Sequence, residues 1–330
     1  MLIKNRGILN SIMAIILVLL MSLLCQSAFS AEKDYPNKPI QLIVAYPPGG
    51  GSDIGSRIIA ERLGEFLGQP VVIVNKPGAG GVIGITAAAK SKPDGYTVAN
   101  CSTTPLIILP LTKKGLDYTM DDFEPICAFA KIPVFLSVKP DAPWATLREF
   151  IAEAKKSPGR LRYSTYGGFT LVHFAMETLA KQAGVSLTHI PFPGSPQALS
   201  AVMGGHVEIA ITTGTGGLIG SGSIRALAVA EEKRLEDFPK VPTLKEQGHN
   251  IIMYPIYGHV VAKGTPKPII DKLYEAHQKA FEKYQKTITE SLKKAEYIPM
   301  LMGPDEFYKR FREDYKLYSK ILGDFGEAIK

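Results

Sequence analysis

The sequence predicts an α/β fold with a parallel sheet in each half of the chain, and three observations support this. Short apolar runs rich in β-branched residues alternate with helical patterns from residue 40 onward. Some runs, such as 71–74, are continuously apolar, which is typical of strands buried on both faces of a parallel sheet. Most runs end in a loop of glycine, proline and hydroxyl residues. In a parallel sheet such loops converge on the edge where ligands bind.

Residues 1–30 are expected to be an export signal rather than part of the fold. Two basic residues precede an almost wholly apolar run at 8–24, and the small residues Ala28 and Ser30 precede Ala31. This pattern predicts a secretory signal peptide cleaved after Ser30 and therefore a periplasmic protein. The alternative is an uncleaved membrane anchor.

The chain is organised around its first glycine-rich loop, residues 46–53, with the sequence YPPGGGSD. A predicted strand at 40–45 precedes this loop, and a helical pattern at 54–67 follows it. Ser52 is a suitable N-cap and Asp53 lies in the first turn, where negative charge is favoured. The consecutive glycines leave backbone N–H groups uncovered, so this loop and the positive helix end form a candidate anion site. The alternative is an ordinary tight turn that needs glycine for positive φ.

The same design recurs along the chain. Strands are predicted at the following positions, each with the loop that follows it: 71–74 with 75–81, 96–100 with 101–105, 161–164 with 165–170, 187–190 with 191–195, and 207–211 with 212–217. The apolar run 126–138 contains Pro133, which disfavours a central strand and favours a bent hinge segment between two domains.

The remaining elements complete the prediction. The helices are expected from a Thr146 cap to 155, at 242–248, from a Thr265 cap followed by Pro266 to about 284, and from 303 onward. Strands are expected at 224–230 and 256–262, the second of which crosses back to the first domain.

Composition and motif searches exclude several classes of function. The formal net charge is +7, but the basic residues are scattered, so nucleic acid is not an expected partner. The glycine loops do not match the nucleotide-binding motifs, and the histidines show no metal-ligand spacing. No catalytic constellation stands out, so we expect neither an enzyme, nor a metal, nor a cofactor. Cys101 and Cys127 form either a disulfide or two buried thiols.

Two charged or ionisable residues have open roles. His173 follows the loop at 165–170 and either contacts a ligand carboxylate or is a core hydrogen-bonding residue. Arg57 either faces the ligand or pairs with Asp53 at i, i+4.

An ordered set of motifs resembles the Bug family, the substrate-binding proteins of tripartite tricarboxylate transporters. The motifs are 35–40 (YPNKPI), 47–53 (PPGGGSD) with Arg57, 75–81 (NKPGAGG), 93–97 (PDGYT), Gly194 with Gly204-Gly205, 225–229 (RALAV), 241–243 (VPT) and 264–266 (GTP). Each motif alone is weak, but together they follow the family order over nearly the whole chain beyond residue 30.

The resemblance implies a two-domain, type II periplasmic-binding-protein fold with a ligand cleft between the domains. Domain 1 would comprise 31–132 and 255–330, and domain 2 would comprise 133–254, with closure about crossings near Ala130 and Pro255. The implied function is capture of a small carboxylate by a monomeric receptor, for delivery to the membrane permease of the transporter. A receptor for a two-component sensor kinase and an exported enzyme are the alternatives.

The resemblance also implies the ligand-binding loops. The expected ligand-binding residues are Pro48, Gly49, Gly50, Gly51, Ser52, Asp53, Ser102, Thr103, Thr165, Tyr166, Gly167, Gly168, Thr170, His173, Pro193, Gly194 and Ser195. This chain departs from the family pattern at Phe192-Pro193 and at 212–214, where two threonines and a glycine replace more polar residues. With Tyr166 and Phe169 nearby, these departures favour a carboxylate with an apolar or aromatic body.

Overall fold

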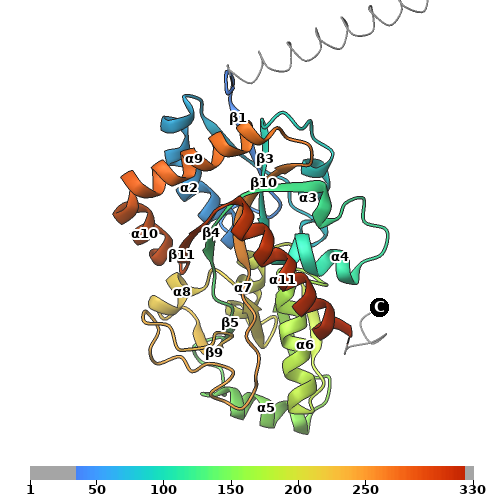
Figure 1. The fold of residues 1–330 in the computed structure, drawn as a ribbon. Coiled ribbons are helices and arrows are strands. Elements are labelled where there is room, and N and C mark those ends of the chain that lie inside the picture. The colour runs from blue at the N-terminus through green and yellow to red at the C-terminus, as the bar shows by residue number, and fades with distance from the viewer. Residues whose placement is uncertain (1–34, 324–330) are drawn as a thin grey trace, which may run out of the picture.

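The computed structural model describes residues 35–323, which form two lobes, each built on one mixed β-sheet with helices on its faces (Figure 1). We call them lobe A and lobe B after sheets A and B. The predicted signal peptide at 1–30 lies outside the described residues. Within 35–323, none of the helices has both the length and the apolar composition needed to cross a membrane.

Sheet A has six strands in the order β11-β4-β10-β3-β1-β2. Their bounds are β1 Ile40–Val44, β2 Val71–Asn75, β3 Thr97–Ser102, β4 Phe123–Lys131, β10 Ile256–Ala262 and β11 Ile298–Met302. Strand β1 pairs in parallel with β2 and β3, as the sequence predicts, whereas β10 is antiparallel to both β3 and β4. The sheet is mixed rather than parallel because β10 returns from lobe B and runs opposite to β3.

Helices cover both faces of sheet A. They are α2 Gly51–Leu67, α3 Val82–Ala89, α4 Leu109–Thr112, α9 Lys267–Lys283, α10 Gln285–Lys294 and α11 Pro304–Gly323, with short 3₁₀ or π turns at Ala79–Gly81, Thr104–Ile108 and Met120–Asp122. Helix α2 packs beside α9, and its apolar residues Ile59, Leu63 and Leu67 are buried there. Gly68 ends α2 in the left-handed conformation.

Sheet B has five strands in the order β7-β6-β8-β5-β9. Its elements are β5 Phe135–Val138, α5 Leu147–Lys156, β6 Arg162–Thr165, α6 Leu171–Ala183, β7 Thr188–Pro191, α7 Ser195–Met203, β8 Ile209–Thr212, α8 Gly216–Gly220 and β9 Arg225–Val229. Strand β6 is parallel to β7 and β8, and β5 is antiparallel to β8 and β9. The Thr146 side chain caps α5, as predicted.

The chain crosses between the lobes at 131–135 and again at 230–256. The apolar run around Pro133 is two strands rather than one, because β4 ends at Lys131 in sheet A and β5 begins at Phe135 in sheet B. Helix α11 starts over sheet A and continues beside α6 of lobe B (Figure 1).

Several predictions of local structure are wrong. The segment 242–248 forms turns rather than a helix, and the N-caps are Gly50 for α2 and Pro266 for α9, not Ser52 and Thr265. Strand β11 and helix α10 were not predicted.

Cys101 and Cys127 are both buried free thiols. Cys101 pairs with Gly258 and Cys127 with His259, neighbouring residues whose side-chain directions alternate, so the two thiols lie on opposite faces of sheet A.

Candidate functional site

The glycine-rich loops of the two lobes meet around a small cavity. Strands β1, β3, β6 and β8 end at this cavity, as expected for the carboxyl edge of α/β sheets. The cavity volume is about 10 Å³, close to the space that one water molecule needs. Its lining residues are Tyr46, Pro47, Gly50, Gly51, Ser52, Ser102, Tyr166, Gly194, Ser195, Thr213 and Tyr257.

Two helix N-termini from opposite lobes reach this cavity. Helix α2 of lobe A starts after Gly50, and helix α7 of lobe B starts after Gly194. Neither N-cap residue supplies a side-chain hydrogen bond to the first turn, so free backbone N–H groups remain there. The positive ends of both helices therefore stabilise negative charge in the same space.

Hydroxyl groups supply further hydrogen-bonding capacity. Thr212 Oγ1 donates to Ser195 Oγ at 2.6 Å, and Ser195 Oγ lies 3.5 Å from Thr213 Oγ1. The Tyr257 hydroxyl bonds to Ser52 of lobe A and Thr213 of lobe B, so it links the two walls. Burial raises the pKa of Tyr257 to about 12, against the opposing effect of these two bonds, so its phenol stays protonated at neutral pH.

The lining residues carry no charged side chain, and three of them are tyrosines. Tyr46 of lobe A and Tyr166 of lobe B meet edge to face, with ring centroids 5.8 Å apart. The Tyr46 hydroxyl donates to the Gly80 carbonyl at 2.7 Å, which ties the second glycine loop to the first. Binding of an anion here would therefore rely on N–H groups, hydroxyls and helix ends rather than on an ion pair.

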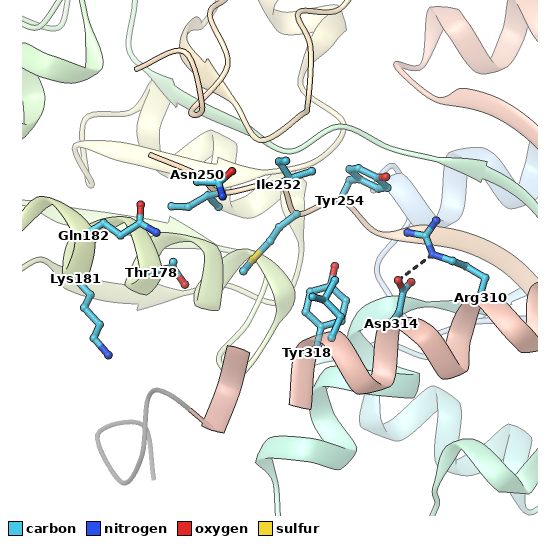
Figure 2. Close-up of a pocket in the computed structure, with 12 residues that line it drawn as sticks. Thr178, Lys181, Gln182, Asn250, Ile252, Tyr254, Arg310, Asp314 and Tyr318 are labelled. Carbon is cyan, nitrogen blue, oxygen red and sulfur yellow. Dashed lines mark hydrogen bonds and ion pairs between the residues drawn. The ribbon is translucent and has the colours of Figure 1, made fainter. Parts of the chain in front are cut away.

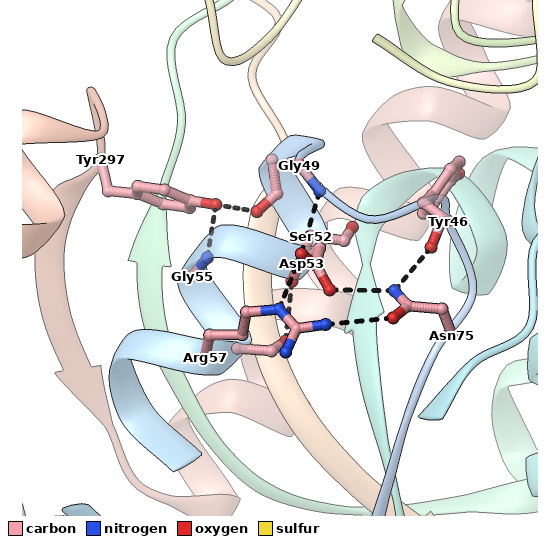
Figure 3. A network of polar contacts seen from close by, with 10 residues as sticks. Tyr46, Gly49, Ser52, Asp53, Gly55, Arg57, Asn75 and Tyr297 are labelled. Atoms are coloured by element: carbon pink, nitrogen blue, oxygen red, sulfur yellow. Dashed lines mark hydrogen bonds and ion pairs between the residues drawn. The ribbon is translucent and has the colours of Figure 1, made fainter. Parts of the chain in front are cut away.

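Asp53 fixes the glycine loop and does not line the cavity (Figure 3). Its Oδ2 accepts from the Gly49 N–H at 3.0 Å and from Arg57 Nε at 2.9 Å, while Oδ1 accepts from Asn75 Nδ2 at 2.9 Å. The same Asn75 nitrogen also donates to the Tyr46 carbonyl at 3.0 Å. Burial opposes ionisation, but the bonds from Arg57, Gly49 and Asn75 outweigh it and lower the pKa of Asp53.

Tyr297 holds the start of α2 from the other side (Figure 3). Its hydroxyl accepts from the Gly55 N–H at 2.9 Å and donates to the Gly51 carbonyl. A side chain at position 55 would overlap this ring, because a Cβ there would lie 2.9 Å from the Tyr297 ring atoms. The first turn of α2 is therefore positioned by a residue more than 240 positions further along the chain.

Glu296, next to Tyr297, makes a buried polar contact between the lobes. It follows α10 of lobe A, has φ of 67°, and its Oε2 accepts from Thr215 Oγ1 of lobe B at 3.2 Å. Its carboxyl group also accepts from the Gly217 N–H. A Cβ at Gly216 would lie 2.1 Å from Glu296 Cγ, so only glycine fits there. Burial raises the pKa of Glu296 to about 8, despite the opposing hydrogen bonds.

The loops of the two lobes are in direct contact around the cavity. A Cβ at Gly194 would lie 3.0 Å from Pro47 Cδ, and a Cβ at Gly51 would lie 3.1 Å from Thr213 Oγ1. Glycine at these positions permits the close approach. A ligand larger than one water molecule therefore does not fit between the loops in this arrangement.

His173 lies behind the third glycine loop. Its Nδ1 accepts from the Phe169 N–H at 3.1 Å, and its ring stacks on His189 with centroids 4.0 Å apart. Burial lowers the pKa of His173 to about 4, so the ring is neutral at neutral pH. In turn, His189 Nε2 is 2.7 Å from Thr165 Oγ1. In this structure His173 and His189 support the loop rather than line the cavity.

The structure separates the predicted ligand-binding residues into two groups. Those that line the cavity are Gly50, Gly51, Ser52, Ser102, Tyr166, Gly194 and Ser195. Those that lie in or behind the surrounding loops are Pro48, Gly49, Asp53, Thr103, Thr165, Gly167, Gly168, Thr170, His173 and Pro193. For example, Thr103 Oγ1 accepts from the Ile256 N–H, and Thr170 caps α6.

Sequence reasoning missed four lining residues: Tyr46, Pro47, Thr213 and Tyr257. Tyr46 and Pro47 belong to the first motif and could have been included with it. Thr213 lies in the predicted strand-exit loop 212–217, at a point where the sequence departs from the family pattern. Tyr257 carries no sequence signal, because its place depends on β10 crossing from lobe B into the middle of sheet A.

A larger cavity, of about 600 Å³, lies elsewhere, between α6, residues 250–254 and α11 (Figure 2). Tyr254 and Tyr318 contribute to its wall, and Arg310 Nε bonds to Asp314 Oδ1 at 2.9 Å. None of the glycine loops lines it, and its arginine already has a carboxylate partner. The small cavity between the loops is therefore the candidate functional site.

Comparison with known proteins agrees with the fold and identifies the family. The family described as "Tripartite tricarboxylate transporter family receptor" matches residues 56–326. Protein BugT of Bordetella pertussis is 32% identical over 301 residues, covering 90% of this chain and 92% of BugT.

Two solved structures share the architecture. Periplasmic binding protein BugD superposes with a TM-score of 0.83 at 28% identity, covering 88% of this chain and 99% of BugD. The protein Rpa4515 of R. palustris, solved with adipate, has a TM-score of 0.83 at 27% identity and covers 87% of this chain and 97% of its own. The fold is thus the two-lobed periplasmic-binding-protein type, in a family of substrate-binding receptors rather than enzymes. The chain belongs to the tripartite tricarboxylate transporter receptor family, and within it is a Bug-type receptor.

Proposed function

We propose that this protein is a periplasmic receptor that captures a small organic carboxylate between its lobes and delivers it to a tripartite tricarboxylate transporter. The observation that carries the proposal is the convergence of two uncapped helix N-termini, from α2 and α7, on one cavity lined by neutral residues. Free N–H groups and helix dipoles replace the hydration of a carboxylate without a charged partner.

The lining favours a carboxylate with an apolar body. Tyr46 and Tyr166 supply ring surface from both lobes, and the hydroxyls of Ser195, Thr213 and Tyr257 supply donors for the carboxylate ends. Phe169, which the sequence placed in the same wall, instead packs against His173. Adipate, the ligand of the R. palustris relative, has this chemistry and is the first ligand to test.

The test is thermal unfolding of the purified protein, stripped of any co-purified ligand, against mono-, di- and tricarboxylates and their uncharged amides. A ligand at 100 times its Kd stabilises the folded state by about 2.7 kcal/mol, which gives a clear rise in midpoint. We expect a carboxylate to raise the midpoint and its amide not to. Equal shifts with acid and amide, or no shift with any acid, would refute carboxylate capture.

A pair of matched variants locates the binding. Tyr257→Phe removes the hydroxyl that bonds Ser52 and Thr213, whereas Tyr318→Phe removes a hydroxyl from the wall of the larger cavity. We expect about tenfold weaker binding for Tyr257→Phe, corresponding to about 1.4 kcal/mol, and unchanged binding for Tyr318→Phe. The reverse ranking would move the site to the larger cavity.

A transport receptor differs from a sensory receptor in the protein that it binds, and it differs from an exported enzyme in leaving its ligand unchanged. A sensory receptor would use the same cleft but bind a histidine kinase, so cross-linking in cells to permease or kinase separates the two. Recovery of the bound ligand unchanged after prolonged incubation excludes an exported enzyme.

A further inference from the structure

A second cluster of reactive side chains lies in the core of lobe A, away from the cleft. Cys127 of β4 and His259 of β10 are direct cross-strand partners, and His277 projects from α9, which covers that face of the sheet. All three side chains are buried, at 0%, 0% and 1% exposure. One potential ligand atom from each lies within 4.8 Å of the others.

The hydrogen bonds in this cluster fix the state of the two imidazoles. His277 Nδ1 lies 2.7 Å from the Leu273 carbonyl, which can only accept, so this nitrogen carries the proton. His277 Nε2 then has a free lone pair, which points at His259 Nδ1 at 2.8 Å. A carbonyl that accepts from the outer nitrogen is the arrangement that orients histidine ligands in metal sites.

His259 has an unexplained buried atom. Because its Nδ1 donates to His277, its Nε2 carries a bare lone pair, and this atom has no hydrogen-bond partner among the described residues. Asn100 is the direct partner of His259 on the opposite neighbour, β3, and its Nδ2 is also without a partner in the described chain. Such orphaned polar atoms are costly, so the polar interactions around His259 are incomplete as the chain stands.

We propose that Cys127, His259 and His277 form a structural site for a thiophilic metal ion of the zinc type. Two imidazoles and one thiolate supply three of the four ligands that a tetrahedral zinc ion takes, and both ligand types are ones that zinc binds. Donor atoms around a tetrahedral zinc are about 3.3–3.8 Å apart, given bonds of 2.0–2.3 Å. His259 Nδ1 and His277 Nε2 are 2.8 Å apart, so they need to separate by about half an ångström to bind one ion. All the potential ligand atoms of the cluster already lie within 4.8 Å of one another.

Each proton of the cluster is accounted for when the metal ion binds. The ion displaces the thiol proton of Cys127 to solvent, as coordinating thiols lose theirs. The ion also replaces the hydrogen bond between the imidazoles. His259 keeps one proton, which moves from Nδ1, the nitrogen that binds the ion, to Nε2. Asn100 is the residue that β3 places opposite His259.

The site would tie α9 to the centre of sheet A. It lies on the face of the sheet opposite Cys101, which pairs with Gly258 instead. This makes the second cysteine a matched control, since it is equally buried but has no neighbouring histidine ligand set among the described residues.

The experiment measures metal content and the cobalt spectrum of the tag-free protein. The wild type, Cys127→Ala and Cys101→Ala are each refolded with Zn²⁺ or Co²⁺ and dialysed against a weak chelator. We expect about one metal ion per chain in the wild type and in Cys101→Ala, and at least a tenfold loss of affinity in Cys127→Ala. The Co²⁺ form of the wild type should show a thiolate-to-metal charge-transfer band.

Two results would overturn the proposal. One is equal retention of zinc by the wild type and Cys127→Ala. The other is wild-type protein that retains no zinc and shows no thiolate–cobalt band after refolding with excess metal, which would assign the orphaned atoms to a bridging water. The wild-type spectrum decides the question even if Cys127→Ala fails to fold.

Discussion

Glu296 should make the protein less stable as the pH rises from 4.5 to 8. The folded state holds the Glu296 proton up to about pH 8, because the carboxyl group is buried between the lobes, whereas the unfolded chain releases it near pH 4.5. Over that interval the folded state binds one more proton than the unfolded state. The stability contribution is therefore fully present below pH 4.5 and is lost as the pH rises through 8.

The size of this effect follows from the pKa difference. Each pH unit within the interval lowers the free energy of unfolding by about 1.4 kcal/mol, so the whole interval amounts to up to about 5 kcal/mol. Glu296→Gln keeps an oxygen that can accept from Thr215 and Gly217 but cannot ionise. We expect the variant to match the wild type near pH 5 and to exceed it by several kcal/mol at pH 8.

The assay is urea unfolding of the wild type, Glu296→Gln and Glu290→Gln at pH 5, 6, 7 and 8. Glu290 lies on α10 with a side chain 67% exposed, so its replacement controls for the loss of one acidic group. Taking the difference between variant and wild type at each pH removes the contribution of every other titrating residue. Parallel curves for the wild type and Glu296→Gln would show that Glu296 ionises normally and would refute the reasoning.

Three further predictions concern the cleft and its supporting loops. Gly194→Ala places a Cβ 3.0 Å from Pro47 in the other lobe, so we expect calorimetry to show about tenfold weaker ligand binding. Gly220→Ala has open space around its Cβ and should bind as the wild type does. Equal affinities of the two variants would contradict the close approach of the loops. Asn75→Ala leaves polar groups of the first loop unpaired and should lower the free energy of unfolding by about 1–3 kcal/mol, and an unchanged urea midpoint would argue against it. His173 should titrate near pH 4 when its ring is followed by NMR, because burial lowers its pKa. Its contribution to the free energy of unfolding is therefore present above pH 6.5 and is lost as the pH falls toward 4. A titration midpoint near pH 6.5 would mean that the ring is solvated.

The parts of the fold that the sequence predicts well are those with strong local signals. Residues 71–75 form a strand because a continuous β-branched run has few other stable environments. The first loop and α2 follow from three glycines between an apolar run and a helical pattern. Seven of the predicted ligand-binding residues line the cavity because strand exits in parallel sheets share one edge.

The parts that were missed depend on contacts distant in sequence. Strand β11, with Pro299 and two methionines, has weak strand propensity and exists because β4 offers it an edge to pair with. Tyr257 reaches the cleft because β10 inserts between β3 and β4. The polar residues of 242–248 resemble a helix start, but Leu244 and Thr243 hydrogen-bond or pair with β9, which holds the segment as turns.

The place of β10 in sheet A has a consequence for the order of folding. Lobe B takes its strands from a continuous stretch, so all five strands of sheet B are present once residue 229 has been synthesised. Sheet A lacks its strand β10 until residue 262 has followed. Until then, the edges of β3 and β4 that pair with β10 are open. A chain that stops before β10 would therefore carry all the strands of sheet B beside an incomplete sheet A, and the open edges of sheet A make such a chain prone to aggregation.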